Sequence, residues 1–179
     1  MESERCAPAD AGTPVDAVLL AFLSRARAAH HLADERESVR DTAGAIASLS
    51  ELVSGPLPHT SHGELAPEVR EVLADSLARL ADLQSQQAAF EPALASIQRG
   101  LGYATDPNYF RGHLLETEGL VEERRAHALE TKDPTGAQAA KQRAIALLEE
   151  AMTVQAGVIK GATPLAASAA IPAASAAPH

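Results

Sequence analysis

The sequence has few aromatic residues and almost no cysteine, and each shortage excludes a class of protein. Aromatic residues make up 3% of the 179-residue chain and tryptophan is absent, although 46% of the residues are hydrophobic. A core built from Ala, Leu, Val and Ile favours α-helices that pack closely through small side chains. Cys6 is the only cysteine, which excludes an internal disulfide and a cysteine-based zinc site.

Positive charge and long hydrophobic runs are also scarce. The chain has 15 Lys and Arg against 24 Asp and Glu, a formal net charge of −9, which argues against nucleic acid or anionic membrane as a partner. The apolar run VLLAFL at 18–23 is too short to span a bilayer. The first residues, MESERCAPADAGTP, lack the basic segment and apolar stretch of a secretory signal. We therefore expect a cytoplasmic protein without a membrane span.

The clearest positive feature is an internal repeat. A skeleton of Leu-Ala-Asp followed by Ala-x-Ala-Ser occurs twice at one offset without a gap, 80 − 32 = 48 residues. Self-similarity at a fixed period is typical of proteins built from stacked supersecondary units. The first copy consists of Leu32, Ala33, Asp34, Ala45, Ala47 and Ser48, and the second of Leu80, Ala81, Asp82, Ala93, Ala95 and Ser96.

Apolar spacing and cap residues predict an all-α chain of six helices. The helices are expected at about 14–38, 42–54, 67–86, 88–103, 107–130 and 134–157, and they form three antiparallel hairpins at about 14–55, 67–103 and 107–157. The predicted N-caps are Thr13, Asp41, Asp106 and Asp133, the first and the last two standing directly before a proline. Residues 1–13 are expected to form a flexible arm and 158–179 a disordered Ala/Pro/Ser tail.

One proline fixes the position of a turn. Pro92 is compatible with the fourth helix only if that helix begins near Ala88, because a residue in the first turn makes no intrahelical donor bond. The turn before it then occupies the same repeat position as Asp41.

These hairpins resemble tetratricopeptide repeats. That family places a large and then a small residue in the first helix, an alanine twelve positions later, and another large and small pair beyond it. The third hairpin fits less closely, since 144 − 119 = 25 residues separate its small positions. The matching residues are Leu32, Ala33, Ala45 and Leu49 in the first hairpin, Leu80, Ala81, Ala93, Ile97 and Gly100 in the second, and Gly119, Ala144, Leu148 and Ala151 in the third.

The resemblance implies a short right-handed solenoid of elongated, degenerate repeats, with a period of 48 residues against the family's usual value of about 34. It also implies a non-catalytic scaffold or adaptor that holds a protein or peptide segment in its concave groove. An acidic groove would favour a partner with basic residues. The groove positions implied by the alignment are Arg27, His30, Asp34, Asp75, Asp82, Ser85, Gln86, Glu116 and Glu123.

Two other functions stay open. The chain is a chaperone for an export substrate if its groove is strongly apolar, or a helical-bundle enzyme or metal protein if its histidines and acids cluster. His30-His31 with Asp34 and Glu35, and His59 with His62 in the first loop, have spacings that can bind a divalent metal. The sequence has no Gly-rich phosphate loop, nucleophile elbow or Cys-His arrangement, so we expect no enzyme and no cofactor.

The last hairpin is predicted to associate with another molecule. Solenoids usually end in a polar capping helix, and the Pro-rich sequence after Gly161 does not favour one. We expect Ile145, Leu148 and Met152 to be covered by self-association or by a partner.

Overall fold

The computed structural model describes residues 16–60 and 62–167, with side chains to residue 162. The described chain is helical and contains no strand beyond one isolated bridge, between His59 and Leu65. This architecture confirms the all-α prediction. The helices are α1 (Ala17–Ser38), α2 (Thr42–Ser54), α3 (Pro67–Gln86), α4 (Phe90–Tyr103), α5 (Tyr109–Leu129) and α6 (Pro134–Ala167).

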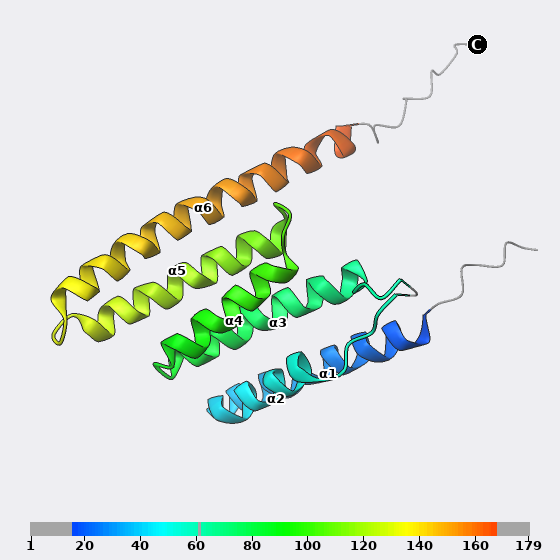
Figure 1. The fold of residues 1–179 in the computed structure, drawn as a ribbon, viewed down its shortest axis with the longest axis horizontal. Helices are drawn as coiled ribbons and strands as arrows, with labels where there is room; N and C mark the ends of the chain where they lie inside the picture. Colours follow the sequence, from blue (N-terminus) through cyan, green and yellow to red (C-terminus); the bar gives the residue numbers. More distant parts are fainter. Residues whose placement is uncertain (1–15, 61, 168–179) are drawn as a thin grey trace, which may run out of the picture.

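Consecutive helices form three pairs, α1 with α2, α3 with α4, and α5 with α6 (Figure 1). Helix α3 contacts both helices of the first pair, and α5 contacts both helices of the second. The pairs therefore adjoin in chain order, and α6 lies at one end of the molecule (Figure 1).

The helix starts follow the predicted capping chemistry in part. The Asp41 carboxylate accepts a hydrogen bond from the Gly44 backbone N–H at 2.9 Å, as expected for the cap of α2. Helix α1 is capped by Asp16, whose carboxylate accepts from Val18 and Leu19; the predicted cap, Thr13, lies outside the described residues. A side-chain acceptor at this position satisfies N–H groups that have no intrahelical partner.

Several predicted boundaries differ from the structure. Helix α4 begins at Phe90 and not near Ala88, because Ala88 has the left-handed backbone of the turn. Helix α5 is capped by Asn108, not Asp106, because Asn108 takes the extended backbone of an N-cap and its side chain accepts from the Arg111 N–H at 2.9 Å. Helix α6 continues ten residues past its predicted end at 157. No proline interrupts residues 135–163, and the last turns of the helix include Pro164. Residues 158–167, expected in a disordered tail, thus belong to α6; residues 1–13 and 168–179 of the predicted tails are outside the description.

The 48-residue repeat is visible in the backbone. Arg40 and Ala88 both have positive φ, 62° and 58°, and 88 − 40 = 48. The hydrogen bonds around them are also equivalent: the N–H of Arg40 donates to Glu37 O, and that of Ala88 to Ser85 O, each at 2.9 Å. Because residues with a Cβ rarely adopt this conformation, the shared strain confirms that α1–α2 and α3–α4 use the same turn.

Small residues lie where paired helices cross, as the repeat predicted. Ala33, Ala45, Ala81 and Ala93 are all 0% exposed. In the third pair, a Cβ built on Gly119 would lie 2.8 Å from Leu148 Cγ. Small side chains let helix axes approach, and larger ones fill the space beside them.

One repeat position has two different environments. Leu80 is 3% exposed and belongs to a core formed mainly by the first pair, whereas Leu32, its counterpart 48 residues earlier, is 46% exposed. The second pair packs on the first, but no described pair precedes the first. Leu32 instead lines a hollow of about 260 Å³ between α1 and α2, together with Arg25, Glu51 and Pro56; we call it the α1–α2 hollow.

Candidate functional site

A groove lies between α1 and α3, and Phe110 from α5 also lines it. Its volume is about 440 Å³. We call it the α1–α3 groove. It is lined by Leu23, Ala26, Arg27 and His30 from α1, by Glu68, Glu71, Val72 and Asp75 from α3, and by Phe110.

The groove combines an apolar floor with an acidic wall. Phe110 and Val72 are partly buried, and Ala26 is 5% exposed. Glu68, Glu71 and Asp75 follow at three- and four-residue spacing along α3, so they share one helix face. These three carboxylates make no ion pair within residues 16–60 and 62–167. Their negative charge is therefore available to a ligand.

His30 joins the groove to the contact between α1 and α3. Its Nε2 lies 2.8 Å from the Oγ of Ser76, a residue that is 0% exposed. Burial lowers the pKa of His30 below its ordinary value of 6.5, and the charge of Arg79 lowers it further, while Asp75 and Asp34 oppose this shift. The neutral imidazole is thus the form that this contact favours.

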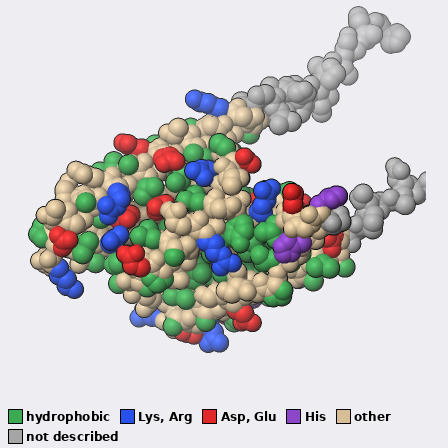
Figure 2. All heavy atoms as spheres, viewed as in Figure 1, with side chains coloured by type: hydrophobic (Ala, Val, Ile, Leu, Met, Phe, Trp, Pro, Cys, Tyr) green, Lys and Arg blue, Asp and Glu red, His purple; other side chains and the backbone are tan. Residues whose placement is uncertain are grey.

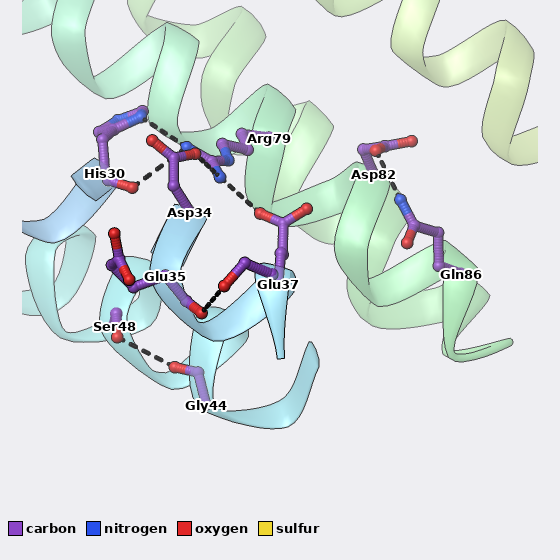
Figure 3. Close-up of polar contacts among 10 residues, drawn as sticks. His30, Asp34, Glu35, Glu37, Gly44, Ser48, Arg79, Asp82 and Gln86 are labelled. Atoms are coloured by element: carbon purple, nitrogen blue, oxygen red, sulfur yellow. Dashed lines mark hydrogen bonds and ion pairs between the residues drawn. The ribbon is translucent and has the colours of Figure 1, made fainter. Parts of the chain in front are cut away.

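Arg79 pairs with acids of α1 and holds the first two pairs together. Its Nη2 donates to Asp34 Oδ1 at 2.6 Å and to the Glu37 carboxylate, and its Nη1 donates to the His30 carbonyl at 3.3 Å (Figure 3). Burial lowers the pKa of Arg79, but the bonds to Glu37 and Asp34 outweigh it and raise the pKa overall. Asp34, expected as a free groove acid, is therefore already paired.

A second arginine makes the equivalent link between α5 and α3. Arg124 donates to Asp82 Oδ1 at 2.7 Å and to Ser85 Oγ at 2.6 Å. Gln86 donates to the other oxygen of Asp82 at 2.8 Å (Figure 3). Asp82, Ser85 and Gln86 thus form one cluster, and Asp82 and Ser85 contact α5 there.

The predicted groove residues therefore divide into three groups. Arg27, His30 and Asp75 line the α1–α3 groove. Glu116 accepts a hydrogen bond from Gln155 of α6 at 3.2 Å, within the third pair, and Glu123 is exposed. The other four positions are held in polar contacts: Asp34 is paired with Arg79, and Asp82, Ser85 and Gln86 form the cluster with Arg124.

Sequence reasoning did not assign six of the lining residues to the groove: Leu23, Ala26, Glu68, Glu71, Val72 and Phe110. The spacing of Glu68, Glu71 and Asp75 was a usable signal, because it places three acids on one face of a predicted helix. Phe110 had no such signal, since its position depends on how the third pair packs against the others.

The histidines expected as candidate metal ligands do not gather. His31 lies 4.0 Å from Glu35, with both side chains mostly exposed, and His59 Nδ1 contacts the carbonyl of Leu57 at 3.0 Å. The described part of the chain holds no group of three or more His, Cys, Asp or Glu that could bind a metal ion. Within the same residues, no helix has the length and hydropathy needed to cross a membrane.

Comparison of the chain with protein-family models, with curated proteins and with solved structures gives no match. The surface carries charges of both signs, with hydrophobic side chains between them, on the face shown in Figure 2.

Proposed function

We propose that this protein is a non-catalytic interaction module that binds a segment of another protein in the α1–α3 groove. The observation that carries the proposal is a hollow of about 440 Å³ that combines an apolar floor with three carboxylates, none of which has an ion pair within the described residues. Binding sites are commonly concave and mostly apolar, with a few polar groups that fix orientation.

The arrangement of helix pairs supports a tetratricopeptide-like stack as the framework. Within the described residues, contacts between pairs connect only neighbours in the chain. The turns of the first two pairs each contain one residue with a left-handed backbone, Arg40 in the first pair and Ala88 in the second. In such a stack each pair buries its face on the next, and the first helices of successive pairs line a concave surface. The groove lies between two such helices, α1 and α3.

The partner segment is recognised by two features. A large apolar side chain fills the floor beside Val72 and Phe110, where water is displaced from apolar surface. A Lys or Arg on the same segment pairs with Glu68, Glu71 or Asp75, since complementary charge orients a partner and disfavours acidic competitors.

A display library of random peptides tests this proposal. Peptides that bind the full chain should be enriched in Lys or Arg together with a large apolar residue. Glu71→Lys should weaken their binding by about tenfold or more, because it places like charges together. Glu71 is exposed and makes no ion pair within the described residues, so the fold should survive the change.

Glu51→Lys is the matched control. Glu51 is also exposed and unpaired within the described part of the chain, but it lines the α1–α2 hollow. If Glu51→Lys abolished binding and Glu71→Lys did not, the peptides would occupy the other hollow and the proposal would be wrong. Asp34 and Asp82 are unsuitable for this test, because their loss would also break the contacts with Arg79 and Arg124.

The apolar floor also favours a second candidate, a chaperone for an aggregation-prone export substrate. Such a protein would suppress aggregation of unfolded chains whatever their charge. Measuring light scattering of an acidic and a basic client separates the two: protection of both supports the chaperone, and binding of the basic client alone supports the interaction module.

A further inference from the structure

The outer side of α6 carries a short ridge with one charge of each sign. Lys141, Ile145 and Glu149 follow at four-residue spacing, and residues four apart on a helix form a continuous ridge. All three are exposed, with Ile145 at 59%, whereas Ala140, Ala144 and Ala151 form the buried side of the same helix. Ile145 and Glu149 thus lie away from α5, the one helix that α6 contacts within the described residues, whereas Lys141 reaches Glu130 at the C-terminal end of α5.

The order of the three residues makes the ridge self-complementary. Read along α6 it is basic, apolar and acidic, so a copy rotated by a twofold axis presents the same residues in reverse. Lys141 of one molecule then faces Glu149 of the other, and the two Ile145 side chains meet at the axis. Twofold dimers use the same patch on both subunits in this way. A parallel arrangement would instead place Lys141 against Lys141.

We propose that a second copy of this chain binds at the ridge, with the two α6 helices antiparallel. Met152, 69% exposed, lies one turn beyond Glu149 and extends the apolar contact. The predicted trio for self-association is corrected at one position: Leu148 is partly buried and packs over Gly119 of α5, so it is not part of the ridge.

The existing contacts of the ridge permit this pairing. Lys141 Nζ lies 2.8 Å from Glu130 Oε1, but both side chains are more than 40% exposed, and exposed pairs are weak and easily exchanged. Glu149 makes no ion pair within residues 16–60 and 62–167. A single-helix contact is smaller than a standard interface, so the dissociation constant is on the order of micromolar or weaker.

Charge reversal provides the decisive test, because two variants that fail alone should work together. Glu149→Lys gives a ridge with two lysines, and Lys141→Glu gives one with two acids. Each variant alone brings like charges together and should raise the dissociation constant by at least about tenfold. An equimolar mixture restores both opposite-charge contacts and should form heterodimers about as tightly as the unaltered chain.

The experiment is sedimentation velocity of the full chain over about 1–500 μM, with each variant alone and mixed. Glu150→Lys is the matched control, because it makes the same charge change one residue away, off the ridge, and should leave the dimer intact. A chain that stays monomeric over the whole range, or a dimer that Glu149→Lys and Glu150→Lys affect equally, would overturn the proposal. The peptide experiment on the α1–α3 groove is independent of this result.

Discussion

The closest helix crossing in the third pair can be tested by adding a single methyl group. Gly119 lies on α5, and a Cβ there would be 2.8 Å from Leu148 Cγ, 3.0 Å from Leu148 Cδ2 and 3.3 Å from the Ala144 carbonyl oxygen. Neither the branched carbon of a packed leucine nor a backbone oxygen moves at low cost. Gly119→Ala should therefore push α5 and α6 apart or force Leu148 out of its rotamer.

The magnitude follows from two opposing effects. Overpacking a well-filled site costs about 1–3 kcal/mol, whereas replacing glycine by alanine inside a helix gains about 1 kcal/mol. Gly157 provides the reference, because it lies inside α6 and a Cβ there would meet no atom within 4 Å. Gly157→Ala should show the gain alone, so the two variants should differ in unfolding free energy by about 1–3 kcal/mol.

Urea unfolding followed by far-UV circular dichroism measures this difference. We expect Gly157→Ala to be more stable than the unaltered chain and Gly119→Ala to be less stable than Gly157→Ala. Equal stability of the two variants would refute the close crossing, and with it the explanation of why a glycine stands at position 119.

Three further predictions concern the first two pairs. Arg79→Met should lower the unfolding free energy by about 1–2 kcal/mol, since it removes charged hydrogen bonds from a side chain that is 25% exposed. If the variant bound peptides more weakly but unfolded at the same urea concentration, a structural role for Arg79 would be contradicted. Burial, with the charge of Arg79 added, holds the pKa of His30 below 6.5, so the folded state binds fewer protons than the unfolded state and stability should fall as the pH drops below that value. Urea titrations at several pH values should show this fall, and His30→Gln should reduce it. Asp41→Ala removes the acceptor for the Gly44 N–H at the start of α2 and should cost about 1 kcal/mol in thermal or urea unfolding; an unchanged midpoint would mean that the cap contributes nothing.

Local features of the fold could be predicted from the sequence because their causes are local. Asp41 caps α2 through an N–H three residues away, and Pro67 begins α3 where the pattern placed it. The equivalence of the Arg40 and Ala88 turns followed from the offset of 48 residues and the position of one proline. Errors occurred where local signals competed, as at Asn108, which caps α5 in place of Asp106.

The candidate site was predicted only in part, because its chemistry depends on contacts between distant segments. The sequence placed Arg27, His30 and Asp75 on facing helices, and the structure brings them to one groove. It could not reveal that Asp34 is paired with an arginine 45 residues away, or Asp82 with one 42 residues away. Whether a carboxylate is free or neutralised depends on whether a basic side chain lies within about 4 Å of it.

The sequence by itself therefore determined the helices, the repeated turn and the small residues at the crossings, all of which follow from the spacing of residues along the chain. The tertiary structure alone decided which charges of the described residues remain unpaired and that Phe110 lines the groove. The physical reason is that the rotation of one helix against another fixes which side chains meet. That rotation is set by packing over the whole interface, and the sequence of either helix does not contain it.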